Sequence, residues 1–349
     1  LNLLNMPSSI KIQTSLQTPV YKQIIEQIEA GIKNGDFLEG DLLPSMNELS
    51  AELEISKETI KKAYSILRER GIINATQGKG FYVADVESHK KLNILLLFDK
   101  LSTYKQVLYS SFESHIGANA EITIHLHNQN IGFFEYLVEE NLDIYDYYVV
   151  TPHFSIDAET RKRLVKTLSR IPNRKLILLD RNIEEMQGNI GVVYQDFEND
   201  AYTGLQQGVR KLKKCTKLNV ITMPSSLYSP YVKKAVERFC SDYGINVEFH
   251  TIITRDIIRP KEVYLILNGQ LDKELIELTR EAKALNYKVG KDISIISYNE
   301  SPINEIILNG LTTISTDFKQ MGELAAKMIL DKTPRKVKCD FHLIRRSTF

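Results

Sequence analysis

Gly78-Lys79-Gly80 is the first stretch whose residue types could do chemistry, because glycines let the backbone approach a phosphate and lysine adds a positive charge. A nucleotide-binding loop needs a helix directly after it, since the phosphate lies at the helix N-terminus. Here Gly80 leads into Phe81-Tyr82-Val83, whose aromatic and β-branched types favour a strand. The stretch therefore predicts a hairpin tip, with a plain solvated surface turn as the simpler alternative.

A basic segment, residues 57–70, comes just before this hairpin. It carries five lysine and arginine residues against two glutamates, a local charge of +3. Lysine side chains near the start of a helix can reach the phosphates and base edges of DNA. The segment and the hairpin together predict contact with a nucleic-acid backbone.

Polar and aromatic side chains follow several apolar runs in the rest of the chain, at the points where we expect strands to end. Carboxylates, amides, cations and aromatic rings together suit a polyhydroxylated sugar, since they bind hydroxyls and cover C–H faces. These residues are Asp99 with Tyr104 and Lys105, then His153, Asp180, Arg181, Ser225 with Tyr228 and Tyr231, Asn268 and Asn299.

Each of these residues also has a simpler interpretation. Polar residues after strands often cap the next helix, and His153 could be an ordinary loop residue. His125 and His127 could face one side of a strand as a metal pair, but the sequence places no third ligand near them, so we expect no metal. The sequence contains no Gly-x-Ser-x-Gly, HExxH or Walker motif, which argues against an enzyme.

Three short helices must position the basic segment and the hairpin. Val20, Ile24, Ile28 and Ile32 recur at helical spacing and stop at Asn34-Gly35. Ser45 and Glu48 form a capping box that predicts a second helix from Met46 to about Leu53. Ser56 can cap a third helix, in which Ile60, Ala63, Tyr64 and Leu67 make one apolar stripe. The order of helices and hairpin predicts a winged helix-turn-helix.

Beyond a polar stretch at residues 85–91, the pattern changes to apolar strands that alternate with amphipathic helices. Near-continuous apolar runs indicate parallel sheets that are buried on both faces. The runs are LNILLLF, YYVV, KLILL, LNVIT, VYLIL and ISIIS, and about 250 residues of this pattern predict two doubly wound α/β lobes.

Composition limits the classes of protein that the chain can belong to. The 349 residues carry 45 basic and 44 acidic side chains, so a nucleic-acid contact must come from a local patch. Three widely spaced cysteines argue against a disulfide framework and agree with a reducing compartment. No apolar run reaches the roughly 18 residues of a membrane span, so we expect a cytoplasmic protein with no membrane partner.

The segment LPSMNELSAELEISKETIKKAYSILRERGIINATQGKGFYV resembles the DNA-binding domain of the GntR family of bacterial transcriptional regulators. In that family the third helix enters the major groove and the wing reaches the minor groove. The resemblance implies the following DNA-contacting residues: Ser45, Asn47, Ser56, Lys57, Glu58, Thr59, Lys61, Lys62, Gly78, Lys79 and Gly80. Asn47, Lys57 and Lys61 stand where the family usually has arginine, so bidentate guanine contacts are replaced by phosphate contacts. Glu54 replaces the usual turn glycine, at a small strain cost if its backbone is left-handed.

Residues 92–349 resemble the effector domain of the LacI/GalR family, which is similar to periplasmic sugar-binding proteins. LILLDRN, GVVYQDFENDAYTGLQQGVRKL, GKDISIISYNE, LTTISTDFKQMGELAAKMIL and LIRRST carry this resemblance. It implies ligand contacts at Asp180, Asn268, Asn299 and Phe318, which join the strand-end residues above. The sequence departs from the family at Asn299, which stands where an aspartate is common.

These features predict a winged helix-turn-helix over 1–84, a linker over 85–91 and a two-lobed α/β effector and dimerisation domain over 92–349. We expect lobe 1 at about 92–194 and 316–332, and lobe 2 at about 195–315 and 333–349. The resemblances imply a homodimeric repressor of a carbohydrate-utilisation operon, without a cofactor, released from operator DNA by a monosaccharide such as L-arabinose or L-fucose. A sugar-responsive activator, a sugar-modifying enzyme fused to a DNA-binding domain, and an architectural DNA-binding protein without an effector remain the alternatives.

Overall fold

The protein forms two compact units, Leu1–Lys91 and Leu92–Phe349. The structure is a computed structural model that describes residues 10–13, 18–76, 80–84, 91–222, 226–267 and 273–349. Among these residues, no helix is both long enough and apolar enough to cross a membrane.

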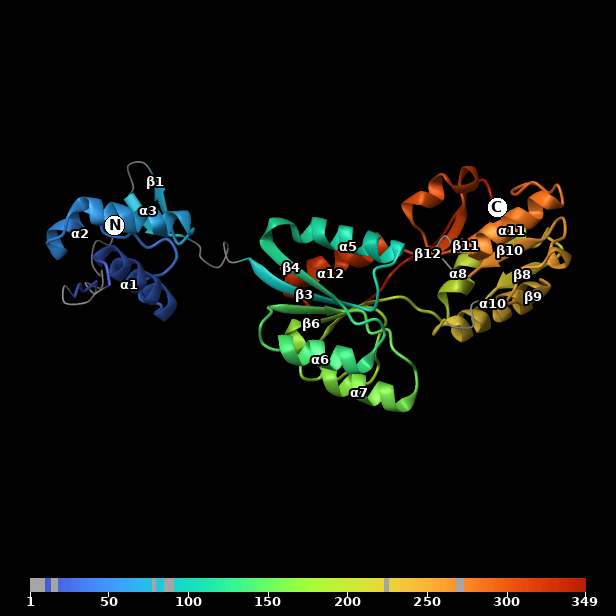
Figure 1. The fold of residues 1–349 in the computed structure, drawn as a ribbon, viewed down its shortest axis with the longest axis horizontal. Coiled ribbons are helices and arrows are strands. Elements are labelled where there is room, and N and C mark those ends of the chain that lie inside the picture. Colours follow the sequence, from blue (N-terminus) through green and yellow to red (C-terminus); the bar gives the residue numbers. More distant parts are fainter. Residues whose placement is uncertain (1–9, 14–17, 77–79, 85–90, 223–225, 268–272) are drawn as a thin grey trace. The chain divides into compact units, whose positions relative to one another are not determined.

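The first unit packs three helices against a two-stranded hairpin (Figure 1). Its elements are α1 (Val20–Asn34), α2 (Met46–Leu53), α3 (Lys57–Glu69), β1 (Ile73–Thr76) and β2 (Gly80–Val83). The expected periodic residues Ile24 and Ile28 are fully buried, together with Leu49 and Leu67 of the other two helices. α1 ends at Gly35, whose φ of 82° lies in the left-handed region that favours glycine. The predicted bounds of the first two helices are confirmed.

The second unit contains two mostly parallel six-stranded sheets, with strand orders β13-β7-β6-β5-β3-β4 and β14-β12-β11-β10-β8-β9. The first sheet consists of β3 (Leu92–Phe98), β4 (Ala120–Leu126), β5 (Tyr147–Val150), β6 (Leu176–Asp180), β7 (Gly191–Tyr194) and β13 (Lys336–Lys338). The second consists of β8 (Leu218–Ile221), β9 (Val247–His250), β10 (Val263–Ile266), β11 (Ser294–Tyr298), β12 (Thr312–Thr316) and β14 (Phe341–Ile344). The predicted fold class, a winged helix-turn-helix with a two-lobed α/β domain, is confirmed.

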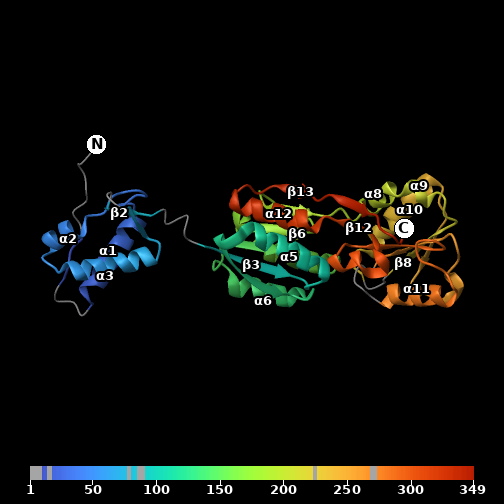
Figure 2. The same cartoon turned by 90° about the horizontal axis from the view of Figure 1, so that it is seen from above.

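Helices cover both faces of each sheet (Figures 1 and 2). In lobe 1, α5 (Thr103–Ile116) and α12 (Phe318–Leu330) pack on one face, and α6 (Ile131–Asn141) and α7 (Ala158–Leu168) on the other. In lobe 2, the helices are α8 (Asp200–Gln207), α9 (Val209–Leu212), α10 (Ser229–Tyr243) and α11 (Lys273–Ala284). The double covering explains why inner strands such as β5 and β10 are apolar along their whole length.

The chain passes between the lobes after β7, after β12 and after β13. The crossing segments are tied together, since Asp317 N donates to Asp340 O at 2.9 Å and Cys339 N donates to Tyr194 O at 2.8 Å. One part of the predicted division is wrong: the sequence places residues 336–338 in lobe 2, yet β13 pairs in parallel with β7 of lobe 1. Pairing with β13 provides hydrogen-bond partners for the backbone groups on the open edge of β7. Residues 336–338 therefore belong to lobe 1, and the chain crosses to lobe 2 only after residue 338.

Candidate functional site

The start of α2 is fixed by the predicted capping box. Ser45 Oγ accepts a hydrogen bond from Glu48 N at 3.2 Å, and a carboxylate oxygen of Glu48 accepts one from Ser45 N at 2.8 Å. The backbone bond from Ser45 also lowers the pKa of Glu48. Glu54 follows α2 as its C-cap residue with a φ of 53°, the left-handed conformation that we expected to cause a small strain.

α3 buries one side and exposes the other, as predicted. Ile60, Ala63, Tyr64 and Leu67 lie in the core of the first unit. Ser56 caps the helix by accepting a hydrogen bond from Thr59 N at 3.3 Å.

The predicted DNA-contacting residues of α2 and α3 differ in how free their side chains are. Lys57 and Asn47 are exposed, and Lys61 lies 3.8 Å from Glu58 in an exposed ion pair that is easily broken by a stronger anion. Lys62 lies over the Tyr21 ring of α1 at 4.0 Å, so it is held closer to the protein. Three residues thus offer their side chains outward, and one supports the packing of α3 on α1.

The wing is an antiparallel hairpin in which Ile73 pairs with Val83 and Thr76 with Gly80. Gly80 is exposed and has a φ of 94°, a conformation that favours glycine. Gly78 and Lys79 lie outside the residues that the structure describes. The hairpin framework agrees with the predicted wing, and contact of its tip with DNA stays a prediction.

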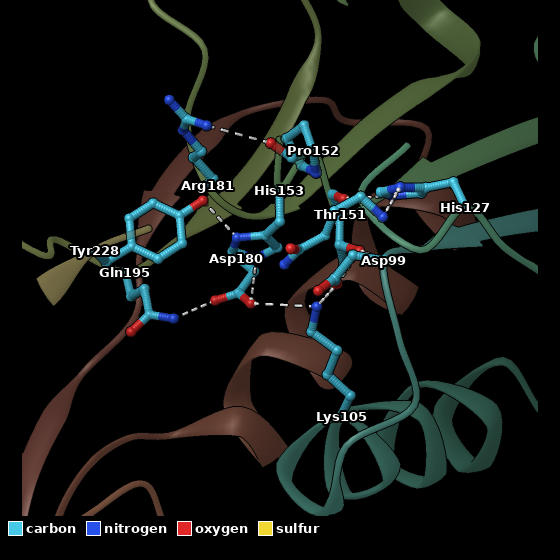
Figure 3. Close-up of polar contacts among 11 residues, drawn as sticks. Asp99, Lys105, His127, Thr151, Pro152, His153, Asp180, Arg181, Gln195 and Tyr228 are labelled. Atoms are coloured by element: carbon cyan, nitrogen blue, oxygen red, sulfur yellow. Dashed lines mark hydrogen bonds and ion pairs between the residues drawn. The ribbon is translucent and has the colours of Figure 1, made fainter. Parts of the chain in front are cut away.

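In the second unit, predicted effector residues of lobe 1 meet in a buried charged cluster (Figure 3). Lys105 on α5 is fully buried, and its ammonium contacts the carboxylates of Asp99 and, at 3.9 Å, of Asp180. Asp99 follows β3 and Asp180 ends β6, while Thr151 after β5 donates to Asp99 Oδ1 at 3.1 Å. Burying an unpaired ammonium costs several kcal/mol of solvation free energy, so contact with the two carboxylates is what allows Lys105 to be buried.

The protonation equilibria of this cluster are displaced. Burial lowers the pKa of Lys105 to about 8, against the opposing effect of Asp180. Burial alone would raise the pKa of Asp180, but its contacts with His153, Lys105 and Gln195 hold it below the usual value. Asp180 also has a φ of 72°, which is strained for a residue with a side chain. Displaced pKa values and local strain are typical of functional sites.

His153 links this cluster to the second lobe. Its Nε2 lies 2.7 Å from Asp180 Oδ2, and its Nδ1 lies 2.5 Å from the hydroxyl of Tyr228 (Figure 3). Burial and the charge of Lys105 lower the pKa of His153 to about 4, although Asp180 opposes the shift. At neutral pH the ring is therefore uncharged, with one nitrogen donating and the other accepting.

The aromatic rings of two further predicted residues, Tyr104 and Phe318, pack against each other. Their ring centroids are 4.5 Å apart, and Phe318 is 3% exposed. Phe318 also lies in the hydrophobic core that α5 and α12 share. Phe318 therefore has a packing role in this core, and a ligand contact stays a prediction.

At the edge of lobe 2, Asn299 follows β11 and takes a left-handed backbone, with a φ of 69°. Its Oδ1 and the hydroxyl of Tyr298 are buried, and neither has a hydrogen-bond partner among the described residues. An unpaired buried polar group costs about 1–3 kcal/mol. A ligand hydroxyl would relieve that cost, which supports the prediction for Asn299.

The remaining predicted effector residues lie less directly in the cluster. Arg181 Nη1 is 3.5 Å from the carbonyl oxygens of Pro152 and Phe154, and its guanidinium lies 5.7 Å from the Tyr228 ring. Tyr231 is half-buried on α10, where its N–H donates to the carbonyl of Tyr228 at 3.0 Å. Asn268 lies outside the described residues.

Sequence reasoning missed Gln195 and Phe197. Gln195 Nε2 donates to Asp180, and Gln195 Oε1 accepts from Thr316 Oγ1 at 3.1 Å, which links the cluster to a crossing segment. Phe197 stacks on Tyr228 with centroids 3.9 Å apart and planes 5° apart. Gln195 directly follows β7, so the rule that selected Asp180 would have found it if that strand had been included in the search.

His125 and His127, which the sequence offered as a possible metal pair, differ in their positions relative to β4. His125 lies on β4, whereas His127 follows that strand, is fully buried, and has Nε2 3.1 Å from Thr151 O. Over the described ranges, no group of three His, Cys, Asp or Glu side chains could hold a metal ion.

Two family profiles match the chain. The profile described as "Bacterial regulatory proteins, gntR family" matches residues 20–83. The profile described as "Periplasmic binding protein-like domain" matches residues 213–348.

Curated relatives match about a fifth to a third of the chain. The HTH-type transcriptional repressor YtrA of Bacillus subtilis is 37% identical over 76 residues, which cover 22% of this chain and 58% of YtrA. The Mannosyl-D-glycerate transport/metabolism system repressor MngR of Escherichia coli is 31% identical over 107 residues, which cover 30% of this chain and 40% of MngR. The match thus spans less than two thirds of the length of either relative.

Solved structures match the second unit in fold. The trehalose repressor from Escherichia coli has a TM-score of 0.59 at 12% identity and covers 73% of this chain and 100% of its own. The dimeric Lac repressor has a TM-score of 0.57 at 15% identity, with 74% and 98% covered. A LacI-type regulator from Alkaliphilus metalliredigens complexed with D-xylulofuranose has a TM-score of 0.56 at 14% identity, with 74% and 99% covered. At these identities the likeness establishes the two-lobed fold.

Proposed function

We propose that this chain, which joins a gntR-family helix-turn-helix domain to a LacI-type periplasmic-binding-protein-like domain, is a sugar-responsive transcriptional repressor that acts in the cytoplasm. The observation that carries the proposal is the presence, on one chain, of an outward basic face on α3 and a buried polar cluster at the strand ends of a two-lobed domain. The first can bind DNA, and the second can bind a small ligand at the position where open α/β sheets hold theirs.

Operator DNA is the proposed partner of the first unit. The first two turns of α3 carry Lys57, Glu58 and Lys61, which can reach base edges and phosphates when the helix enters the major groove. Asn47 and the hairpin with Gly80 would contact the flanking backbone.

A neutral monosaccharide such as L-arabinose or L-fucose is the proposed effector. The names of MngR and of the trehalose repressor associate those proteins with sugars, and the Alkaliphilus structure holds D-xylulofuranose. In this chain, Asp180, His153 and Asn299 would bind hydroxyl groups, and Tyr104 would cover an apolar face of the sugar ring. The buried cluster sets the single ammonium of Lys105 against two carboxylates, and this excess of negative charge favours a neutral sugar over a sugar phosphate.

We further propose that the protein acts as a homodimer, by analogy with a dimeric Lac repressor of similar fold that carries an 11-residue C-terminal deletion. Two copies of the first unit would bind the two halves of a palindromic operator. Sugar binding would change the angle between the lobes and so the spacing of the two DNA-binding domains. A coupling free energy of about 1–3 kcal/mol between the two sites is sufficient for such regulation.

A thermal-shift screen of the full chain against monosaccharides and sugar phosphates at millimolar concentration tests this proposal. We expect a neutral sugar to raise the melting temperature and, in a gel-shift assay with operator DNA, to weaken binding. A sugar that tightened DNA binding would reverse the sign of regulation. If no sugar changed either measurement, the effector function would be refuted.

A further inference from the structure

A hydrogen bond at His153 of the buried cluster joins the two lobes. Tyr228 lies directly before α10 of lobe 2, and its hydroxyl is 2.5 Å from Nδ1 of His153, which follows β5 of lobe 1 (Figure 3). Contacts such as the one between Gln195 and Thr316 lie within the crossing segments instead. The His153–Tyr228 bond can therefore respond to a change in the angle between the lobes.

The direction of this hydrogen bond follows from the other nitrogen of the imidazole. His153 Nε2 lies 2.7 Å from a carboxylate oxygen of Asp180, which can only accept, so Nε2 carries the proton. In the neutral ring, Nδ1 is then an acceptor, and the phenol of Tyr228 must donate to it. Burial raises the pKa of Tyr228, so the phenol keeps the proton that it donates.

The ring of Tyr228 is held in place as a ligand would be held. Phe197 stacks against one face at 3.9 Å, and the guanidinium of Arg181 lies 5.7 Å from the ring. A donor hydroxyl on a flat apolar body is also what a monosaccharide ring presents to a binding site. Tyr228 thus offers His153 the same hydrogen bond, and Phe197 the same stacking surface, that a sugar would offer.

We propose that Tyr228 is a built-in competitor of the effector: in the free protein its phenol occupies the place of a sugar hydroxyl on His153, and the sugar must displace it. The inference rests on the proposed effector function. It implies that the effector carries a hydroxyl that donates to His153 Nδ1 and an apolar ring face that replaces Tyr228 on Phe197. Because only molecules with a displaced Tyr228 bind sugar, the apparent affinity is lower than that of the open site.

The test compares the full-length wild type with Tyr228→Phe, which keeps the stacked ring and removes only the hydroxyl. The Tyr136→Phe variant is the matched control, because Tyr136 is 56% exposed on α6 and its ring stacks on Phe133. Affinity for L-arabinose, L-fucose and D-glucose is measured by calorimetry. Amide hydrogen exchange of residues 151–154 and 226–230 is measured without sugar.

We expect Tyr228→Phe to bind the effector roughly two- to tenfold more tightly, as the loss of one competing hydrogen bond predicts. We also expect faster exchange in both segments, because the bond between them is gone. The Tyr136→Phe control should match the wild type in both measurements.

Two results would overturn the inference. Weaker sugar binding by Tyr228→Phe would make the phenol a ligand contact rather than a competitor. Unchanged amide exchange would mean that the His153–Tyr228 hydrogen bond does not hold the two segments together in the free protein. If none of the three sugars bound either protein, the proposed effector would be in error, and the exchange measurement alone would decide whether Tyr228 holds the lobes.

Discussion

At the scale of single residues, the second unit concentrates its buried charge in one place. Lys105, Asp99 and Asp180 are almost fully buried, with the one ammonium in contact with both carboxylates, and His153 is kept uncharged beside them. Such an arrangement contributes little net stability compared with an apolar core of the same volume. Its position at the strand ends, where ligands of open α/β sheets bind, is better explained by recognition of a polar molecule.

The DNA-binding unit makes a prediction at the same scale. Lys61→Ala should weaken operator binding and reduce the slope of log K against log salt by about one, because one phosphate contact and its released counterion are lost. Binding is measured by fluorescence anisotropy over a series of salt concentrations. Lys33→Ala, which removes an exposed lysine from the last turn of α1, is the control and should leave the slope unchanged. An unchanged slope for Lys61→Ala would refute the proposed docking of α3.

At the scale of elements, the packing of α5 on α12 depends on a glycine, which has no side chain. Gly322 lies in α12, and a Cβ atom there would be 2.4 Å from the carbonyl oxygen of Leu108 and 2.7 Å from the backbone nitrogen of Phe112. Backbone atoms of a neighbouring helix cannot move aside as a flexible side chain can. The two helices therefore approach closely because residue 322 is glycine.

We expect Gly322→Ala to destabilise the second unit by about 1–3 kcal/mol, the usual cost of overpacking. Gly132→Ala in α6 is the matched control, because the nearest atom to its added Cβ is 3.5 Å away. Alanine is also the better helix former, so this control should be neutral or stabilising by up to about 1 kcal/mol. Urea unfolding of both variants is the measurement. Equal stabilities of the two variants would show that α5 and α12 can separate without cost.

At the scale of the whole molecule, two buried histidines connect the stability of the second unit to pH. Burial lowers the pKa of His127 to about 4, against the effect of the Thr151 carbonyl, and the pKa of His153 is also about 4. The ordinary value is 6.5, so between pH 6.5 and 4 the unfolded chain binds more protons than the folded one. Their contribution is fully present above pH 6.5 and is lost as the pH falls.

We therefore expect the free energy of unfolding of the second unit to fall on acidification from pH 6.5 to 5. Each histidine can contribute a slope of up to about 1.4 kcal/mol per pH unit. Urea titrations at several pH values provide the measurement. His127→Gln should remove about half of this slope, and a stability that rose on acidification would contradict the assignment.

Several features of this protein could be predicted from the sequence because they depend on local chemistry. The capping box of Ser45 and Glu48, the apolar stripe of α3 and the continuous apolar run of β3 each specify their element without help from distant residues. The apolar runs also predicted which polar residues lie at the strand ends, because the residue that follows a strand must lie at the carboxyl end of that strand.

Tertiary structure alone decided which of these residues meet. Asp99 and Asp180 lie far apart in the sequence, and only the parallel order β6-β5-β3 brings them to one lysine. The same holds for His153 and Tyr228, which come from different lobes, and for β13, whose three residues carry no signal strong enough to assign them to lobe 1. Local sequence determines elements because their hydrogen bonds are short in range. The site depends on how the sheets assemble, which is set by contacts between residues remote in the chain.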